Sequence, residues 1–278
     1  MAVQPAQRTF PRLMIRRRHA NIIMLVILAL PLLLFVGLPL LALLLRAGLG
    51  VLLQNLANTQ VMQAVGLSLM TTTLTTLLAV LMGTPLAYLL ARYEFRGRNI
   101  VETMIELPMV LPPAVAGVAL LMAFGRRGVL GSYLSDAGLE LAFTQTAVVL
   151  AQLFVAGPFY VKAAIAGFAR VEKDMKEAAA IDGAGPLATF RQITVPLTWP
   201  ALSGGLVMTW ARALGEFGAT IIFAGNFPGR TQTMPLAIYI GFELDLSVAL
   251  TLSIMLLVIS FGVLLVVKGL LRQRIGSI

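Results

Sequence analysis

Two charged side chains stand within an apolar run in the last third of the sequence. Arg212 and Glu216 are the only charges in residues 197–224, and their four-residue spacing places both on one face of a helix. A lone charge near the centre of a bilayer costs about 2.5 to 3.5 kcal/mol. We therefore expect an ion pair, which serves either as a structural bridge or as part of an external gate or anion path.

Arg230 belongs to a second group of side chains that suit an anion. It follows an Asn-Phe-Pro-Gly turn, residues 226–229, and precedes Thr231 and Thr233. An arginine beside hydroxyl groups can bind an oxyanion, and the turn residues indicate an exposed loop. Docking of an external partner and plain loop structure are equally good interpretations of this segment.

A stripe of small residues runs along the apolar residues 64–91. Thr72, Thr76, Ala79 and Gly83 recur at helical spacing, which suits close packing of one helix on another. Threonine hydroxyls in helices often bond to a carbonyl of the preceding turn. The pattern favours packing, and lining of a path by the two threonines is the alternative.

Residues 162–196 mix charged and small apolar side chains. Residues 177–181, with three alanines, favour a short helix, and Gly183 suits the left-handed conformation that ends one. Pro186 is a good first residue for a second helix, which we expect Pro196 to break. The sequence therefore predicts two short helices joined at a glycine corner. Their methyl groups either bind a soluble partner or pack on the protein's own bundle.

The composition excludes most enzyme chemistry. The chain has no Cys and one His, so it cannot build a disulfide framework, a thiolate or histidine metal site or a cysteine nucleophile. It contains no Gly-rich loop that ends in Gly-Lys-Ser/Thr, so we expect ATP to be bound by another polypeptide and no cofactor in this chain. With 59% hydrophobic and 12% charged residues, against about 25% charged in soluble domains, an integral membrane protein is predicted.

Six apolar runs are long enough to cross about 30 Å of hydrocarbon as helices. They are residues 20–45, 64–91, 103–124, 141–161, 197–224 and 246–267. The first run is too long for a signal-peptide core, so we expect it to be retained. Three prolines in the third run predict a bend, for which a static kink is favoured and a hinge is the alternative. The expected fold is an all-α integral membrane bundle of six transmembrane helices in a single domain, residues 1–278.

The basic residues predict the orientation. If the N-terminus is cytoplasmic, 16 of the 21 Lys and Arg residues lie inside, four lie outside and Arg212 lies within a span. Positive charge is enriched in cytoplasmic loops, so both termini are predicted inside, with residues 1–19 as a basic cytoplasmic segment. The net charge of +9 is a topology signal, and we expect no nucleic-acid partner because the basic residues flank apolar runs.

The cytoplasmic segment also carries a specific series of residues. They are Glu177, Ala178, Ala179, Asp182, Gly183, Ala184, Phe190, Ile193 and Pro196. At these spacings the series resembles the EAA loop of binding-protein-dependent ABC importer permeases, with Val195 where that family usually has Leu. The resemblance implies a type I permease-like bundle in which residues 162–196 form the coupling loop that inserts into a cleft on an ATP-hydrolysing subunit.

The same resemblance implies the partners and the location. They are a second copy of the chain, cytoplasmic ATP-binding subunits and an external, periplasmic binding protein, assembled in the inner membrane of a prokaryote. Residues 212–239 resemble molybdate permeases among the oxyanion importers. The implied cargo is therefore a tetrahedral oxyanion such as molybdate or tungstate, moved by alternating access.

Two alternatives stay open from the sequence. One is a sulfate or thiosulfate permease, which belongs to the same class. The other is a stand-alone secondary transporter or channel coupled through Arg212 and Glu216. That class is expected to need carboxylates near the membrane midplane, often in repeated halves, and only Glu216 and Glu106 are available.

Overall fold

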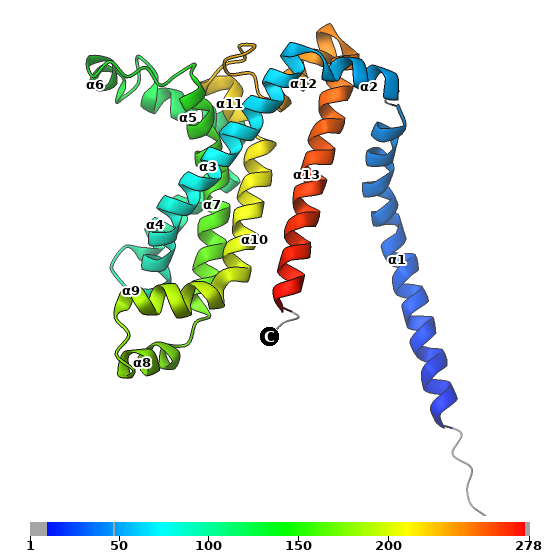
Figure 1. Cartoon of the computed structure of the whole chain (residues 1–278), viewed down its shortest axis with the longest axis vertical. Helices are drawn as coiled ribbons and strands as arrows, with labels where there is room; N and C mark the ends of the chain where they lie inside the picture. Colours follow the sequence, from blue (N-terminus) through cyan, green and yellow to red (C-terminus); the bar gives the residue numbers. More distant parts are fainter. Residues whose placement is uncertain (1–9, 47, 276–278) are drawn as a thin grey trace, which may run out of the picture. The chain divides into compact units, whose positions relative to one another are not determined.

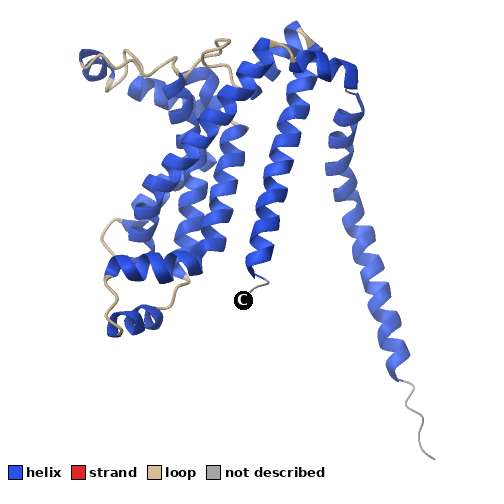
Figure 2. Cartoon of the chain, viewed as in Figure 1, coloured by secondary structure: helices blue, strands red, loops and turns tan. Residues whose placement is uncertain are grey.

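The computed structural model describes residues 10–46 and 48–275. Every regular element in these residues is a helix (Figure 2), as the predicted all-α fold requires. The chain divides into two compact units, residues 1–49 and residues 50–278, which are described separately. We refer to them as unit 1 and unit 2.

Unit 1 contains one long helix, α1 (Phe10–Arg46). The helix begins ten residues before the predicted span of residues 20–45 and continues through two prolines. None of its described side chains is buried. Of the predicted basic N-terminal segment, residues 1–9 lie outside the described residues and residues 10–19 belong to α1.

The centre of unit 2 is built from three long helices that lie side by side (Figure 1), namely α3 (Thr59–Arg92), α7 (Gln145–Ala169) and α10 (Val195–Leu214). Glycines allow α7 and α10 to approach closely. A methyl group added at Gly205 would lie 2.6 Å from Cβ of Ala163, and one at Gly167 would lie 2.8 Å from Cβ of Ala201. These distances leave no room for a larger residue, which is the packing that small residues provide between membrane helices.

The threonines of α3 are buried in this packing. Thr72 and Thr76 are 0% and 4% exposed, and the Thr76 hydroxyl donates to the Thr72 carbonyl at 2.8 Å. Thr75 donates to Oε1 of Gln152 on α7 at 3.1 Å. The hydroxyls of Thr75 and Thr76 therefore bond to the adjacent helix and to the backbone, whereas the buried Thr72 hydroxyl has no hydrogen-bond partner among the described residues.

The third predicted span is broken into two helices. α4 (Arg98–Val110) and α5 (Pro113–Phe124) meet at a bend of 119°. The predicted kink is confirmed, and it is sharp enough to separate two helices because consecutive Pro112 and Pro113 supply no N–H groups to continue the ladder. Pro113 instead begins α5, where its missing N–H costs nothing.

The fifth predicted span, residues 197–224, is also not continuous. α10 ends at Leu214, and a second short helix, α11 (Gly218–Phe223), begins four residues later. By length and composition four described helices can cross a membrane, or five if the bent α4–α5 pair counts as one span. The prediction of six spans counted residues 197–224 as one long helix. In the structure the helix that enters this run, α10, is 20 residues long and ends at Leu214.

Further helices of unit 2 are α2 (Leu49–Leu56), whose first residue belongs to unit 1, α6 (Gly131–Asp136), α8 (Lys173–Ile181), α9 (Pro186–Thr189), α12 (Met234–Leu244) and α13 (Leu246–Ile275). Asp245 connects the last two helices. It accepts bonds from the Ser247 N–H at 2.9 Å and the Ser247 hydroxyl at 2.7 Å, and these bonds hold the pKa of the Asp245 carboxyl below its usual value. The carboxylate therefore stays ionised at neutral pH.

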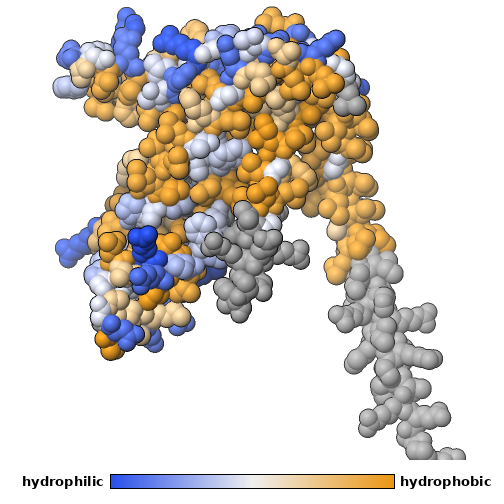
Figure 3. All heavy atoms as spheres, in the orientation of Figure 1, coloured by the Kyte–Doolittle hydropathy of each residue, from blue (hydrophilic) through white to orange (hydrophobic). Residues whose placement is uncertain are grey.

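Polar and apolar side chains are segregated over the surface of unit 2. Figure 3 shows an apolar band across its middle, with hydrophilic residues gathered at the two ends. One end carries α8, α9 and, apart from them, the last turns of α13, and the opposite end carries α5, α6 and α11 (Figure 1). This division matches a bilayer crossed by the long helices.

The predicted orientation can be tested because the chain has no cysteine of its own. Glu94 follows α3 and Ser135 lies in α6, and both are exposed. A membrane-impermeant maleimide should label Glu94→Cys only in inside-out vesicles and Ser135→Cys only in right-side-out vesicles. The cysteine-free parent chain gives the background, and the reverse labelling pattern would contradict the orientation.

Candidate functional site

Residues 170–194 lie in the predicted coupling loop, and we call them the coupling segment after that prediction. They form two short helical pieces joined at a glycine corner, as predicted. α8 (Lys173–Ile181) ends before Gly183, whose φ of +86° is the left-handed conformation that glycine adopts most easily. The Ala184 N–H then donates to the Ala179 carbonyl at 2.9 Å, which is the bond that closes a Schellman-type helix end. α9 (Pro186–Thr189) follows.

The start of the predicted coupling loop needs correction. Residues 162–169 belong to the last turns of α7, so the loop is shorter than the predicted residues 162–196. The helix continues through them because α7 packs tightly on α3 and α10. Pro196 does not break the second helix either, because a π-helical turn, η1 (Phe190–Thr194), leads directly into α10.

The π turn explains how Pro196 is accommodated. The Val195 N–H donates to the Phe190 carbonyl, five residues back instead of four. This wider turn stands immediately before the proline, whose ring would clash with a carbonyl in an unperturbed α-helix. The coupling segment is thus continuous with α10.

The coupling segment presents apolar side chains on its outer surface. Ile181 is 87% exposed and Leu187 is 78% exposed, while Glu177 and Asp182 are exposed between and beside them. Ala179 is buried and Ala178 is exposed. Apolar side chains rimmed by carboxylates on a surface are typical of a protein-docking site.

An aromatic cluster joins the coupling segment to the membrane helices. The ring of Phe190 lies 5.2 Å from that of Tyr88 on α3 and 6.0 Å from that of Phe168 on α7, and Tyr88 and Phe168 are 5.5 Å apart. We call these three residues the aromatic cluster. Edge-to-face pairs of this kind contribute about 0.5 to 1.5 kcal/mol each beyond buried area. Sequence reasoning identified Phe190 and missed the other two rings.

Arg92 makes a second connection at the same end of unit 2. Its Nη2 atom donates to the Val171 carbonyl at 2.9 Å. Val171 lies between the end of α7 and the start of α8. The last residue of α3 is therefore bonded to the chain just before α8.

The opposite end of α10 carries the predicted ion pair. Arg212 Nη1 lies 2.7 Å from Glu216 Oε2, with the arginine side chain 29% exposed and the glutamate 1% exposed. The other carboxylate oxygen, Oε1, accepts a bond from the Ala219 N–H at 2.8 Å. Glu216 therefore satisfies an N–H in the first turn of α11 as well as the charge of Arg212, and it holds the break between the two helices.

The two broken helices meet at this point. A methyl group at Gly218, the first residue of α11, would lie 2.7 Å from Cβ of Pro113, the first residue of α5. One at Gly117 would lie 2.9 Å from the Ala219 carbonyl oxygen. Because discontinuous helices are the usual sites of gates and binding sites in transporters, we refer to the α4–α5 and α10–α11 breaks as the candidate gate.

The loop before α12 does not gather its predicted anion-binding groups on one surface. Arg230 is exposed, whereas Thr231 and Thr233 are 0% and 1% exposed. The Thr231 hydroxyl accepts a bond from the Phe227 N–H at 3.1 Å and so stabilises the turn. These residues are neighbours in the sequence, but the chain enters the packed interior directly after Arg230, so residues 231–234 are buried while Arg230 is exposed. Thr72 and Thr76, the other candidate path residues, lie within helix packing.

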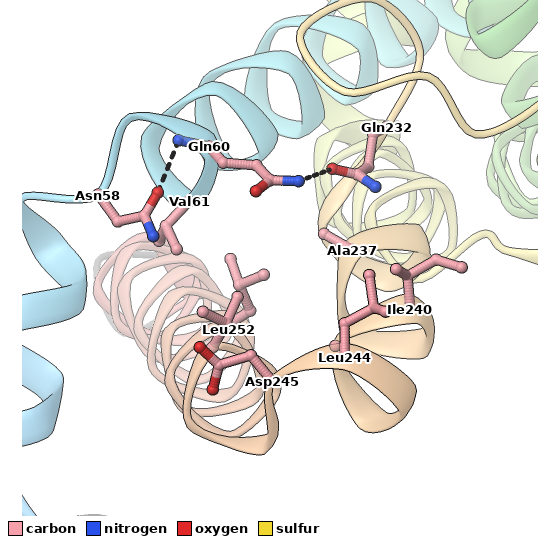
Figure 4. A pocket seen from close by; sticks show the side chains of 11 residues that line it. Asn58, Gln60, Val61, Gln232, Ala237, Ile240, Leu244, Asp245 and Leu252 are labelled. Atoms are coloured by element: carbon pink, nitrogen blue, oxygen red, sulfur yellow. Dashed lines mark hydrogen bonds between the residues drawn. The ribbon is translucent and has the colours of Figure 1, made fainter.

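A pocket of about 140 Å³ lies beside this loop, between the start of α3 and the α12–α13 corner. Gln60 donates to Gln232 across one side at 3.4 Å, and the Asp245 carboxylate lines the other side (Figure 4). An ionised carboxylate repels an oxyanion, so the pocket does not suit anionic cargo. Sequence reasoning missed it because its polar residues come from the ends of different apolar runs.

The ion pair yields a stability prediction. Arg212→Met leaves the buried Glu216 carboxylate without its counter-charge, so the free energy of unfolding should fall by at most about 3 to 5 kcal/mol. The melting temperature in detergent and the folded yield should fall with it. The double variant Arg212→Met, Glu216→Gln should recover both, since the glutamine oxygen can still accept from the Ala219 N–H.

Transport by the stable double variant distinguishes the two roles of the pair. Normal transport would make the pair a structural bridge, and loss of transport would make it part of the gate. An Arg212→Met variant with unchanged melting temperature would contradict the pairing argument itself.

Comparison with known proteins agrees with these features. Residues 83–275 match the family described as binding-protein-dependent transport system inner membrane component. The chain is 41% identical to the molybdenum transport system permease protein ModB of Mycobacterium bovis, over 87% of this chain and 91% of that protein. It is 36% identical to the probable transport system permease protein NifC of Clostridium pasteurianum, over 84% and 82% of the two chains.

The fold is similar to that of solved transporters. A bacterial ABC transporter involved in the import of the acidic polysaccharide alginate aligns with a TM-score of 0.72 and 19% identity, over 93% of this chain and 97% of that chain. The family match covers both the coupling segment and the candidate gate. The protein therefore belongs to the family of inner membrane components of binding-protein-dependent transport systems, the permease subunits of ABC importers.

Proposed function

We propose that this chain is the membrane-spanning subunit of an ATP-driven importer of molybdate or tungstate. Two copies would work with two cytoplasmic ATPase subunits and one external binding protein. The cargo assignment depends on one observation, the similarity to a permease named for molybdenum transport over most of both chains. Family membership supports the kind of partner, because the family is named for its binding proteins.

The coupling segment supports docking of an ATPase subunit. Ile181 and Leu187 expose apolar surface at the end of unit 2 where no long helix covers them. Glu177 and Asp182 add carboxylates that can pair with basic residues of a partner. Burial of these side chains in a cleft would fix α8 and α9 to the ATPase, so that approach of two ATPase subunits moves both helices.

α10 supports transmission of that movement across the membrane. Its 20 residues form a helix about 30 Å long. One end continues from the coupling segment through η1, and the other carries Arg212 and the break before α11. Displacement of α9 therefore shifts the contact between α11 and α5. This is the physical basis that we propose for alternating access.

The cargo assignment is tested by reconstitution. The permease, its ATPase and its binding protein in proteoliposomes should hydrolyse ATP faster when molybdate or tungstate is supplied, and should accumulate the same anions. Sulfate, thiosulfate and phosphate form the comparison panel. Stimulation by sulfate in preference to molybdate would overturn the cargo assignment and leave the importer assignment intact, whereas uptake by the permease without ATPase would contradict the importer assignment.

The glycine corner gives a prediction about coupling. Gly183→Ala strains a residue whose φ is +86°, so α8 should change direction relative to α9, and transport per ATP hydrolysed should fall several-fold. Gly185→Ala is the matched control, because Gly185 has a φ of −69° and open space around its Cβ position. Equal transport in the two variants would show that the corner is not needed for coupling.

A further inference from the structure

A second ion pair lies within the membrane-spanning part of unit 2. Lys162 Nζ on α7 is 2.8 Å from Glu106 Oε1 on α4. Lys162 stands seven residues before the end of α7, or about 10 Å along the helix. If about 30 Å of hydrocarbon is centred on this 25-residue helix, Lys162 lies about 7 Å inside the boundary, towards the coupling segment.

The pair is exposed in a way that lipid does not tolerate. The side chains of Lys162 and Glu106 are 49% and 47% exposed, whereas the buried partner of the Arg212 pair is 1% exposed. A lysine at this depth can extend to the interface when it is alone. Here its ammonium is held by a glutamate on another helix, so both charges stay in place. Charged side chains within membrane proteins face a water-filled space or protein, not hydrocarbon.

The exposed residues that follow Lys162 have small or charged side chains. They are Ala166 and Ala169 on α7 and Arg170 directly after the helix. The exposed face of α3, by contrast, carries Leu74, Leu77 and Leu81, which are side chains suited to lipid. The exposed side chains between Lys162 and Arg170 are therefore smaller than those on the leucine face of α3, and the two end residues carry charge.

We propose that Lys162 binds the oxyanion on the inner part of the transport path and that Glu106 releases it. This inference rests on the proposed function for the direction of transport. The ammonium supplies the positive charge that draws a dianion through a low-dielectric region, while a lone lysine would hold that anion too strongly. Glu106 competes for the same ammonium and displaces the anion, because conduction needs binding weak enough to reverse.

Transport by charge variants tests the proposal in the reconstituted complex with ATPase and binding protein. Lys162→Gln should lower molybdate uptake at least tenfold, and Lys162→Arg should retain most of it. Glu106→Gln should slow release and lower uptake several-fold. Glu102→Gln is the matched control, because Glu102 lies one turn away on α4 in a separate ion pair with Arg98 at 2.9 Å, and it should transport normally.

The double variant separates anion binding from simple charge neutralisation. If Lys162 and Glu106 only neutralise each other, Lys162→Gln with Glu106→Gln should transport normally, and that result would overturn the proposal. If Lys162 binds the anion, the double variant should stay as slow as Lys162→Gln. Wild-type uptake by Lys162→Gln alone would also overturn it.

A readout that does not depend on transport keeps the inference separate from the proposed function. Millimolar tungstate, molybdate or sulfate should slow modification of Lys162 by an amine-reactive reagent in the assembled complex, as followed by mass spectrometry, and should do so more strongly in Glu106→Gln. No protection by any of these anions would overturn the proposal. Failure of wild-type uptake with protection intact would count against the proposed function alone.

Discussion

The contacts of Phe168 attach the coupling segment to the long helices of unit 2. Phe168 is fully buried, and it contacts Tyr88 and Phe190. The three rings come from α3, α7 and η1, so a single cluster fixes the coupling segment to two membrane-spanning helices. The Arg92 bond to the Val171 carbonyl adds a second attachment at the same end of unit 2.

The other end of the bundle follows a different principle, in which broken helices remain satisfied. Each break leaves N–H groups without helical partners, and in a bilayer such groups cannot turn to water. At the α10–α11 break, Glu216 accepts the Ala219 N–H and carries a charge that Arg212 balances. At the α4–α5 break, Pro113 has no N–H to satisfy. Side-chain chemistry thus allows a 119° bend and a helix interruption to lie against each other.

Local features of the sequence predicted local structure well. The Gly183 corner and the Arg212–Glu216 pair depend on spacing within a few residues, and both are present. The all-helical fold follows from composition and from the length of the apolar runs. The resemblance at the coupling segment identified the family that residues 83–275 match, because it depends on a series of residues close together in the sequence.

Features that depend on contacts between distant segments could not be predicted from spacing. Tyr88 and Phe168 are ordinary apolar-run residues until α3 and α7 bring them to Phe190. Lys162 was expected in a loop, and only the continuation of α7 brings it to Glu106. The contact between α5 and α11 likewise joins two segments that are distant in the sequence.

The π turn has a consequence for how the chain tolerates changes in length. η1 contains one residue more than an α-helical turn would need, as the bond from the Val195 N–H to the Phe190 carbonyl indicates. Because the wider turn passes five residues through about the angle that four residues cover in an α-helix, deleting one residue there, such as Gln192, would restore α-helical geometry with little change in the direction of the residues on either side. The same deletion within the regular turns of α10 would rotate one part of the helix against the other by about 100°. This segment therefore tolerates the loss of one residue better than the helix that follows it.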